Sequence, residues 1–217
     1  MSPEPAGPAR VRALRVSEIP AACGLASEAF RQNRFYQEAL GLDPEAFDAY
    51  WDAFLPLAMA DAGARVHVIE DDGAMAGLLV VSMGAFPAPV RGLRFLGALL
   101  GRIGPRRWLR YLRFVAAYES IMHRPRAELR VEARGLWLLV SDRARHPGLG
   151  ARLVRGAVGR SRAEGKTLFT GLVDASNRRL LDFYRRSGFT VSDPFRFGGG
   201  LAARIEMRAR AREEGSA

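Results

Sequence analysis

The sequence is poor in the residues that build disulfides and metal sites. Its 217 residues include one cysteine, Cys23, which cannot form an internal disulfide and agrees with a reducing compartment. Cys23 lies among helix-forming and apolar residues, which indicates a small packed side chain and not a nucleophile. The three histidines, His67, His123 and His146, are far apart and lack the spacing of metal ligands, so we predict no metal site.

Long apolar runs are also missing. None approaches the length of a bilayer span, and we expect no membrane span. The start of the chain has no apolar signal segment, so residues 1–9 are predicted to be a disordered tail and the cytoplasm is the expected compartment. Residues 212–217 are expected to fray. The remaining residues, 10–211, have the length and composition of a single globular domain.

Lysine is nearly absent, because Lys166 is the only one. The net charge of +10 is therefore carried by arginines, which are spread along the chain between acidic residues. Scattered charge of this kind favours a solvated basic surface, and we expect no nucleic-acid partner.

The chain does contain a strand, a glycine turn and a helix in succession. The apolar run Leu136–Val140 predicts a buried strand, and helical spacing begins near Ala151. Between them, Gly148 and Gly150 let the backbone approach a ligand closely. Because a helix start presents unpaired N–H groups and the positive end of the helix dipole, this order favours an anion site.

A second motif follows another predicted strand at Lys166–Val173. Asn177 and Tyr184 are seven residues apart, about two helical turns, so they are predicted to lie on one face of a short helix. Gly188 is placed to end that helix.

Together the two motifs, Arg145-x-x-Gly148-x-Gly150 and Asn177 through Gly188-Phe189, resemble those of the GNAT superfamily of acyl-CoA-dependent N-acyltransferases. The resemblance covers Leu136 to Phe189, about a quarter of the chain. His146-Pro147 departs from the usual pattern, and Pro147 removes a backbone donor and stiffens the turn.

The resemblance implies an α/β (α+β) fold. It has a mixed, mostly antiparallel central sheet of about six or seven strands, helices on both faces, and fourth and fifth strands that splay apart. The rest of the sequence fits this order. Asp71-Asp72-Gly73 predicts a hairpin turn between two central strands. Residues near 84–134 exceed a short connection and predict a helical insertion, which includes an arginine-rich amphipathic helix from Pro105.

The resemblance also implies roles for individual residues. Acetyl-CoA, or another acyl-CoA, would be the cosubstrate, and Tyr184 would be the general acid that protonates the leaving sulfur. The general base stays open between Glu132, Glu119, His123 and a water chain. The residues expected to hold the pyrophosphate are Arg145, His146, Pro147, Gly148, Leu149, Gly150 and Ala151. Those expected to hold the pantetheine arm are Leu138, Val140 and Asn177.

The implied reaction is transfer of an acetyl group to a primary amine by direct attack in a ternary complex. The acceptor would be a small molecule or a peptide, and a homodimer stays open. The alternative is a basic module that binds RNA or a membrane surface and keeps a vestigial or regulatory acyl-CoA site. That alternative rests on the net charge and the arginine-rich helix, which can equally cover the core with its apolar side.

Overall fold

The computed structural model describes residues 9–84, 86–141 and 146–208. Within these residues there are eight strands: β1 (Arg10–Ala13), β2 (Ala64–Asp71), β3 (Ala74–Ser82), β4 (Glu132–Val140), β5 (Leu168–Asp174), β6 (Thr190–Val191), β7 (Phe195–Phe197) and β8 (Gly200–Arg208). They form one sheet in the order β1-β2-β3-β4-β5-β8-β6, with β7 also paired to β8. Only the β4–β5 pairing is parallel.

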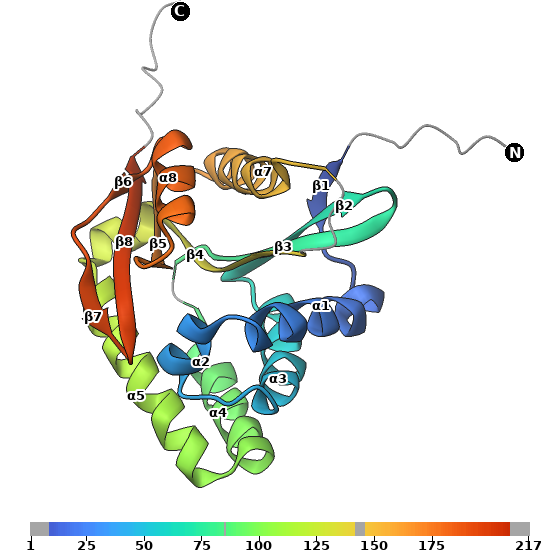
Figure 1. Cartoon of the computed structure of the whole chain (residues 1–217), viewed down its shortest axis with the longest axis vertical. Coiled ribbons are helices and arrows are strands. Elements are labelled where there is room, and N and C mark those ends of the chain that lie inside the picture. Colours follow the sequence, from blue (N-terminus) through green and yellow to red (C-terminus); the bar gives the residue numbers. More distant parts are fainter. Residues whose placement is uncertain (1–8, 85, 142–145, 209–217) are drawn as a thin grey trace, which may run out of the picture.

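The helices are α1 (Ile19–Arg31), α2 (Arg34–Leu40), α3 (Ala46–Ala60), α4 (Pro89–Ile103), α5 (Pro105–Met122), α6 (Arg126–Val131), α7 (Leu149–Ala163) and α8 (Arg178–Arg186). Figure 1 shows α7 and α8 on one face of the sheet and α1 to α5 on the other. The predicted fold class, a mostly antiparallel mixed sheet with helices on both faces, is confirmed. Among the described residues, none of the helices combines the length and apolar character that a bilayer crossing requires.

The β2–β3 hairpin forms where the turn signal predicted it. Asp71 pairs with Ala74 across the turn. Asp72 and Gly73 have φ values of 52° and 77°, the left-handed geometry of a type I′ turn. The hairpin places Asp71 at the end of β2, next to His146.

Two hydrophobic cores lie on opposite faces of the sheet. The core under α1, α3, α4 and α5 is rich in aromatic rings, and Trp137 of β4 contacts many of them. The rings around Trp137 belong to Phe30, Tyr36, Tyr50, Trp51, Phe54 and Phe114. The core under α7 and α8 is mainly aliphatic, with Ile69, Leu153 and Ile205 among its members. Alternation along β4 therefore sends Trp137 and Leu138 to different cores.

Residues 89–131 form the three helices α4, α5 and α6. That this segment is an insertion stays a prediction. The α5 side that packs inward is aromatic, with Tyr111 buried and Phe114 and Tyr118 partly buried. Leu109 of the same helix is exposed. Trp108 is held by a 2.8 Å hydrogen bond from its ring N–H to the Leu96 carbonyl. The helix covers the core with rings, and its arginines face outward.

The end of the sheet differs in detail from the sequence prediction. Two short strands, β6 and β7, lie there, separated by Ser192-Asp193-Pro194. Pro194 lacks an N–H and interrupts the ladder, which gives eight strands in place of six or seven. Residues 1–8 and 209–217 lie outside the described residues, so the tail, the frayed end and the single-domain division stay predictions.

Candidate active site

The fork between β4 and β5 is the central feature of the site. The two strands pair in parallel only from Glu132 and Leu168 to Gly135 and Gly171. Beyond these glycines each strand continues without the other, so the predicted splay is confirmed. On its other edge β4 pairs with β3, but Leu136 is skipped between the Gly135 and Trp137 pairings, which is a β-bulge at the fork.

A cavity of about 80 Å³ fills the fork, and we refer to it as the fork cavity. Its walls include residues 135–138 of β4 and 171–173 of β5, together with aliphatic side chains such as Val154 from α7. Two phenols, those of Tyr36 and Tyr184, also line it. The fork cavity is therefore a mainly apolar recess whose hydroxyl-bearing lining residues are these two phenols, Ser161 and Thr170.

A larger groove of about 1170 Å³ opens next to the fork cavity. One wall runs from residues 138–141 to His146 and residues 148–151, and includes Asn177. The opposite wall comes from α1, α2 and the start of β8. The groove and the fork cavity share Tyr36, Leu138 and Leu180, so the two form one continuous surface.

The start of α7 lies on this groove. Gly148 precedes the helix with a φ of 80°, a left-handed conformation that glycine adopts without strain. Its carbonyl accepts the first bond, from Arg152 N at 3.1 Å, so the N–H groups of Leu149, Gly150 and Ala151 have no intrahelical acceptor. The predicted anion site therefore has the required backbone geometry. Arg145 lies outside the described residues.

Asp71 contacts His146, just before the start of α7. The sequence did not connect Asp71 with the site. The buried Asp71 carboxylate accepts a 3.3 Å hydrogen bond from the His146 backbone N–H and also contacts the His146 ring through Nδ1. His146 itself is exposed. The aspartate was recognised only as part of a turn signal, because its pairing with a residue 75 positions later has no local signature.

Asp71, Asp72 and His146 also bring three potential ligand atoms within 4.8 Å of one another. The histidine spacing gave no hint of this group, because two of its members are carboxylates from the hairpin. The Nδ1 atom of His146 already contacts Asp71, which accounts for the cluster without an ion. The expected absence of a metal stays a prediction.

Asn177 occupies the N-cap of α8. Its side-chain oxygen accepts a 3.0 Å hydrogen bond from Leu180 N, and the residue lines the groove. The residue thus precedes the helix on which Tyr184 lies, so the two do not share a helix face as the sequence predicted. Asn177 lines the groove and Tyr184 lines the fork cavity, so both border the same continuous surface.

Tyr184 is buried against Phe183 and Phe189, whose rings meet it edge-on. Burial raises the pKa of its phenol, and the nearby Tyr36 phenol raises it further. The phenol therefore stays protonated across the physiological range. A neutral hydroxyl is the form that can donate a hydrogen bond or a proton.

Tyr36 is a second phenol that the sequence analysis did not select. It lies on α2 at the junction of fork cavity and groove, with its ring edge-on to Trp137. Burial, and then the negative charge of Asp174, raise the pKa of Tyr36 to about 12. Asn33 caps α2 by accepting a 3.4 Å hydrogen bond from Tyr36 N, and Gly41, with a φ of 65°, lies at the C-cap of the helix.

The three candidates for the general base lie away from this surface. Glu132 is buried, accepts a hydrogen bond from Thr170 and pairs with Arg134 at 3.1 Å. Glu119 also pairs with Arg134, at 3.6 Å, and His123 is exposed just after α5. None of the three lines the described groove or fork cavity. Their role as base stays a prediction. The carboxylates that do line the groove are Glu28, Glu38 and Asp174.

Among known proteins, the chain resembles solved structures of acetyltransferases. No protein-family model and no curated protein sequence matches the chain. Among solved structures, the chain is similar to an N-acetyltransferase from Staphylococcus aureus Mu50, with 14% identity, 93% of this chain and 99% of that chain covered, and a TM-score of 0.59.

Two further similar structures were solved with a coenzyme. The structure of yncA, a putative acetyltransferase from Salmonella typhimurium with its cofactor acetyl-CoA, is 14% identical, with 96% and 99% coverage and a TM-score of 0.57. The PaiA N-acetyltransferase from Thermoplasma acidophilum in complex with coenzyme A is 13% identical, with 94% and 100% coverage and a TM-score of 0.55. At these identities the likeness concerns the fold, and this chain has the fold of the GNAT N-acetyltransferases.

Proposed function

We propose that the protein is an acetyl-CoA-dependent N-acetyltransferase that transfers the acetyl group to a primary amine by direct attack in a ternary complex. One observation carries the proposal: a single continuous surface joins the start of α7 to the fork cavity and the Tyr184 phenol. An extended acyl-CoA needs both an anion site for its pyrophosphate and an apolar recess for its thioester, and here they are adjacent.

Acyl-CoA binding would use the backbone more than side chains. The N–H groups of Leu149, Gly150 and Ala151 would bind the pyrophosphate, with Arg145 as an additional donor and His146-Pro147 shaping the turn. The edge of β4 at Leu138 and Val140, which has no β5 partner, would pair with the pantetheine amides as an added strand. The amide NH₂ of Asn177 would donate to the same arm.

The chemical step follows from this placement. The amine nitrogen attacks the thioester carbonyl, the C–N bond forms and the C–S bond breaks, and the departing sulfur takes a proton from the Tyr184 hydroxyl. The attacking nitrogen loses a proton to water in the groove or to a carboxylate there. Holding both reactants in line is the main catalytic contribution of the fork, because it replaces an encounter between two free molecules.

The groove favours a cationic acceptor. Its wall opposite the α7 start contains Glu28 and Glu38, and Asp174 lies at its floor beside Tyr36. Carboxylates attract a protonated amine and can accept its proton before attack. Glu38 is partly neutralised by Arg34, whose Nε donates to it at 2.6 Å.

The test is a panel of primary amines and short peptides with acetyl-CoA, with the free thiol of CoA as the readout. We expect amine-dependent thiol release for at least one acceptor class, and a mass increase of one acetyl group on that acceptor. If acetyl-CoA does not bind and no amine elicits thiol release, the proposal is wrong.

A further inference from the structure

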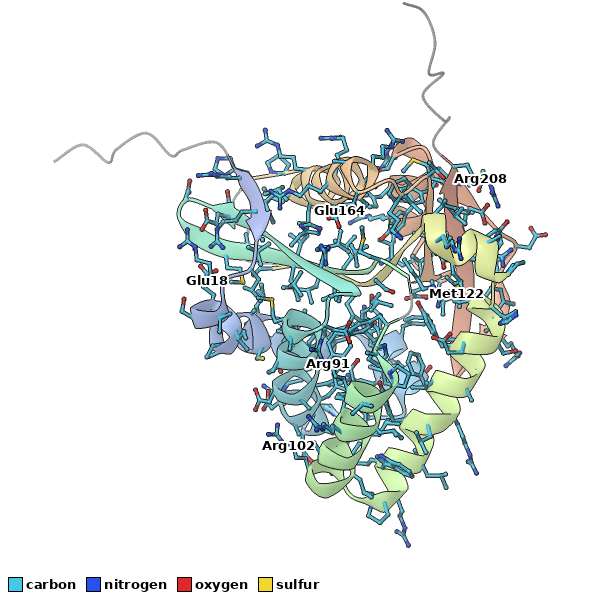
Figure 2. All side chains as sticks on the ribbon, turned by 180° about the vertical axis from the view of Figure 1, so that it is seen from behind. Glu18, Arg91, Arg102, Met122, Glu164 and Arg208 are labelled. Carbon is cyan, nitrogen blue, oxygen red and sulfur yellow. The ribbon has the colours of Figure 1, made fainter. Side chains whose placement is uncertain are left out.

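The helical hairpin of α4 and α5 has a charge distribution unlike the rest of the chain. Residues 73–118, 46 positions in succession, contain no aspartate or glutamate and seven arginines. Elsewhere acidic residues interrupt the arginines at much shorter intervals. Figure 2 shows the two helices meeting at one end of the molecule, with Arg102 near the turn between them.

Most of these arginines are not neutralised by the protein. Arg107 pairs with Asp43 at 2.5 Å, and Arg91 lies 3.9 Å from Asp61. The other five form no ion pair with any residue that the structure describes: Arg94, Arg102, Arg106, Arg110 and Arg113. The hairpin surface is therefore strongly positive and lacks internal counter-charges.

Large aliphatic side chains are exposed on the same two helices. Val90, Leu93 and Leu100 of α4 and Leu109 of α5 are all exposed, although each helix also has buried residues on its inner side. On α4 the three recur at spacings of three and seven, so they form one stripe that points away from the buried Phe95 and Leu99. Gly97 and Gly101 lie within this stripe and keep it shallow.

On helical spacing, the arginines flank this apolar stripe. On α4, Arg91 and Arg94 lie next to the stripe. On α5, Arg106 and Arg113 lie next to Leu109 on the outer side of the helix. An apolar centre bordered by cations matches the interface of an anionic bilayer, where aliphatic side chains enter the acyl boundary and guanidinium groups contact the phosphates.

We propose that the α4–α5 hairpin docks the protein onto an anionic phospholipid surface. Val90, Leu93, Leu100 and Leu109 enter the interface, and the surrounding arginines contact the lipid headgroups. The hairpin lies on the face of the sheet opposite α7, so docking leaves the start of α7 accessible (Figure 1). The inference is independent of the proposed transfer reaction.

Two other occupants fit the surface less well. RNA sites of this size use exposed aromatic rings for stacking, whereas the hairpin turns Phe95, Trp108 and Tyr111 inward and exposes aliphatic residues. A second copy of the chain would bring two sets of unpaired arginines together, and like charges across an interface oppose association.

The test is flotation of the full chain with vesicles of phosphatidylcholine alone or mixed with phosphatidylglycerol. We expect binding to the mixed vesicles, loss of binding at high salt, and none to phosphatidylcholine alone. The variant Arg94→Gln/Arg106→Gln/Arg113→Gln should lower the partition coefficient by roughly a hundredfold. The control Arg10→Gln/Arg155→Gln/Arg186→Gln removes the same charge from other surfaces and should lower it by about threefold or less.

The aliphatic residues have matched controls of their own. Leu93 and Leu109 are 71% and 48% exposed, and Val16 and Leu201 are 73% and 46% exposed on other elements. Leu93→Ser/Leu109→Ser should weaken vesicle binding by about tenfold or more, and Val16→Ser/Leu201→Ser should not. Thermal melts of all four variants check that each is folded.

The proposal is overturned by any of three results. The first is the absence of binding to the mixed vesicles. The second is an equal loss of vesicle binding in each hairpin variant and its matched control, which would mean that the hairpin is not the docking surface. The third is RNA binding or self-association through the hairpin without vesicle binding, which would assign the surface to a different occupant.

Discussion

The two faces of the sheet are built from different side chains and contribute differently to the site. The face under α7 and α8 is mainly aliphatic and presents backbone groups to the groove, through Gly148, the α7 start and the open edge of β4. The opposite face is packed with aromatic rings around Trp137. In the proposed reaction, coenzyme binding would depend on main-chain geometry, and acceptor binding would depend on how the rings and the carboxylates of α1 and α2 are packed.

The largest expected effect concerns Tyr184, which belongs to the aliphatic face. Tyr184→Phe keeps the ring and removes the hydroxyl, so kcat should fall by about 10² to 10⁴ while KM for acetyl-CoA changes little. Steady-state kinetics with CoA release as the readout measures this. Tyr111→Phe removes a buried hydroxyl from the aromatic face and serves as the control, with an expected kcat close to that of the unmodified protein.

A Tyr184→Phe variant with undiminished kcat would remove Tyr184 as the acid. A collapse of acetyl-CoA affinity with unchanged turnover would make the hydroxyl a binding contact. Because the pKa of Tyr184 is raised, its titration should add no alkaline decline to the pH–rate profile of the unmodified protein below about pH 10.

His67 should make the stability depend on pH. Burial, and then the charge of Arg160, lower its pKa to about 4, so the native state favours the neutral ring. The unfolded chain binds a proton near pH 6.5, which means that the stabilisation is complete above that pH and is lost as the pH falls towards 4. The free energy of unfolding should fall by about 3 kcal/mol, because of the size of the pKa difference between the unfolded and native states.

Urea denaturation at pH 7 and at pH 4.5 measures that loss. His67→Gln should reduce the difference between the two pH values, whereas His123→Gln, a change at an exposed position, should leave it intact. If His67→Gln loses as much stability in acid as the unmodified protein, another group is responsible for the acid sensitivity.

Gly150→Val tests the main-chain site. The added Cβ would lie 3.6 Å from Val140 Cγ2, an ordinary contact, so the fold should persist while the two methyl groups project into the groove beside the α7 start. Acetyl-CoA at a hundredfold excess over Kd should stabilise the unmodified protein by about 2.7 kcal/mol, and the variant should lose that gain. Thermal melts with and without acetyl-CoA report it.

Gly159→Val is the matched control, because Gly159 lies on the same helix with no atom near its Cβ position and outside the groove lining. It should retain the ligand-dependent shift in melting temperature. A shift that persists in Gly150→Val would mean that the phosphates bind elsewhere.

The smallest expected effect concerns the arginine-rich helix. Arg106→Gln/Arg110→Gln/Arg113→Gln should leave acetyl transfer to a small soluble amine within a few fold, because α5 contacts the core through its rings and not through these side chains. The same kinetic assay measures this. A large loss of acetyl transfer would mean that the outer surface of α5 contributes to the reaction.

The sequence predicts the aliphatic face better than the aromatic one. Gly148, Gly150 and the Asn177 cap have local reasons for their positions, a left-handed turn, a close approach and a helix start, and these reasons are visible in a few consecutive residues. The β2–β3 turn is predictable on the same basis. Strand boundaries outside such motifs, as between β6 and β7, depend on pairing across the whole sheet.

Contacts between segments far apart in the chain could not be predicted from the sequence. Asp71 meets His146 across 75 positions, and Tyr36 reaches the fork from a helix whose sequence indicates only packing. The general base is the clearest example. Glu132 is close to the fork in the chain but is held by Thr170 and Arg134, whereas Asp174 and Glu28 reach the groove only through the folded arrangement.

The central claim is that acyl-CoA binds with its pyrophosphate on the start of α7 and its arm along β4. Amide hydrogen exchange of the full chain, measured with and without CoA at saturation, tests it most directly. We expect exchange to slow at Leu149, Gly150 and Ala151 and at Leu138 and Val140, by about tenfold or more, while exchange in α5 is unchanged. Saturating CoA with unaltered exchange at these amides, or with protection confined to α4 and α5, would contradict it.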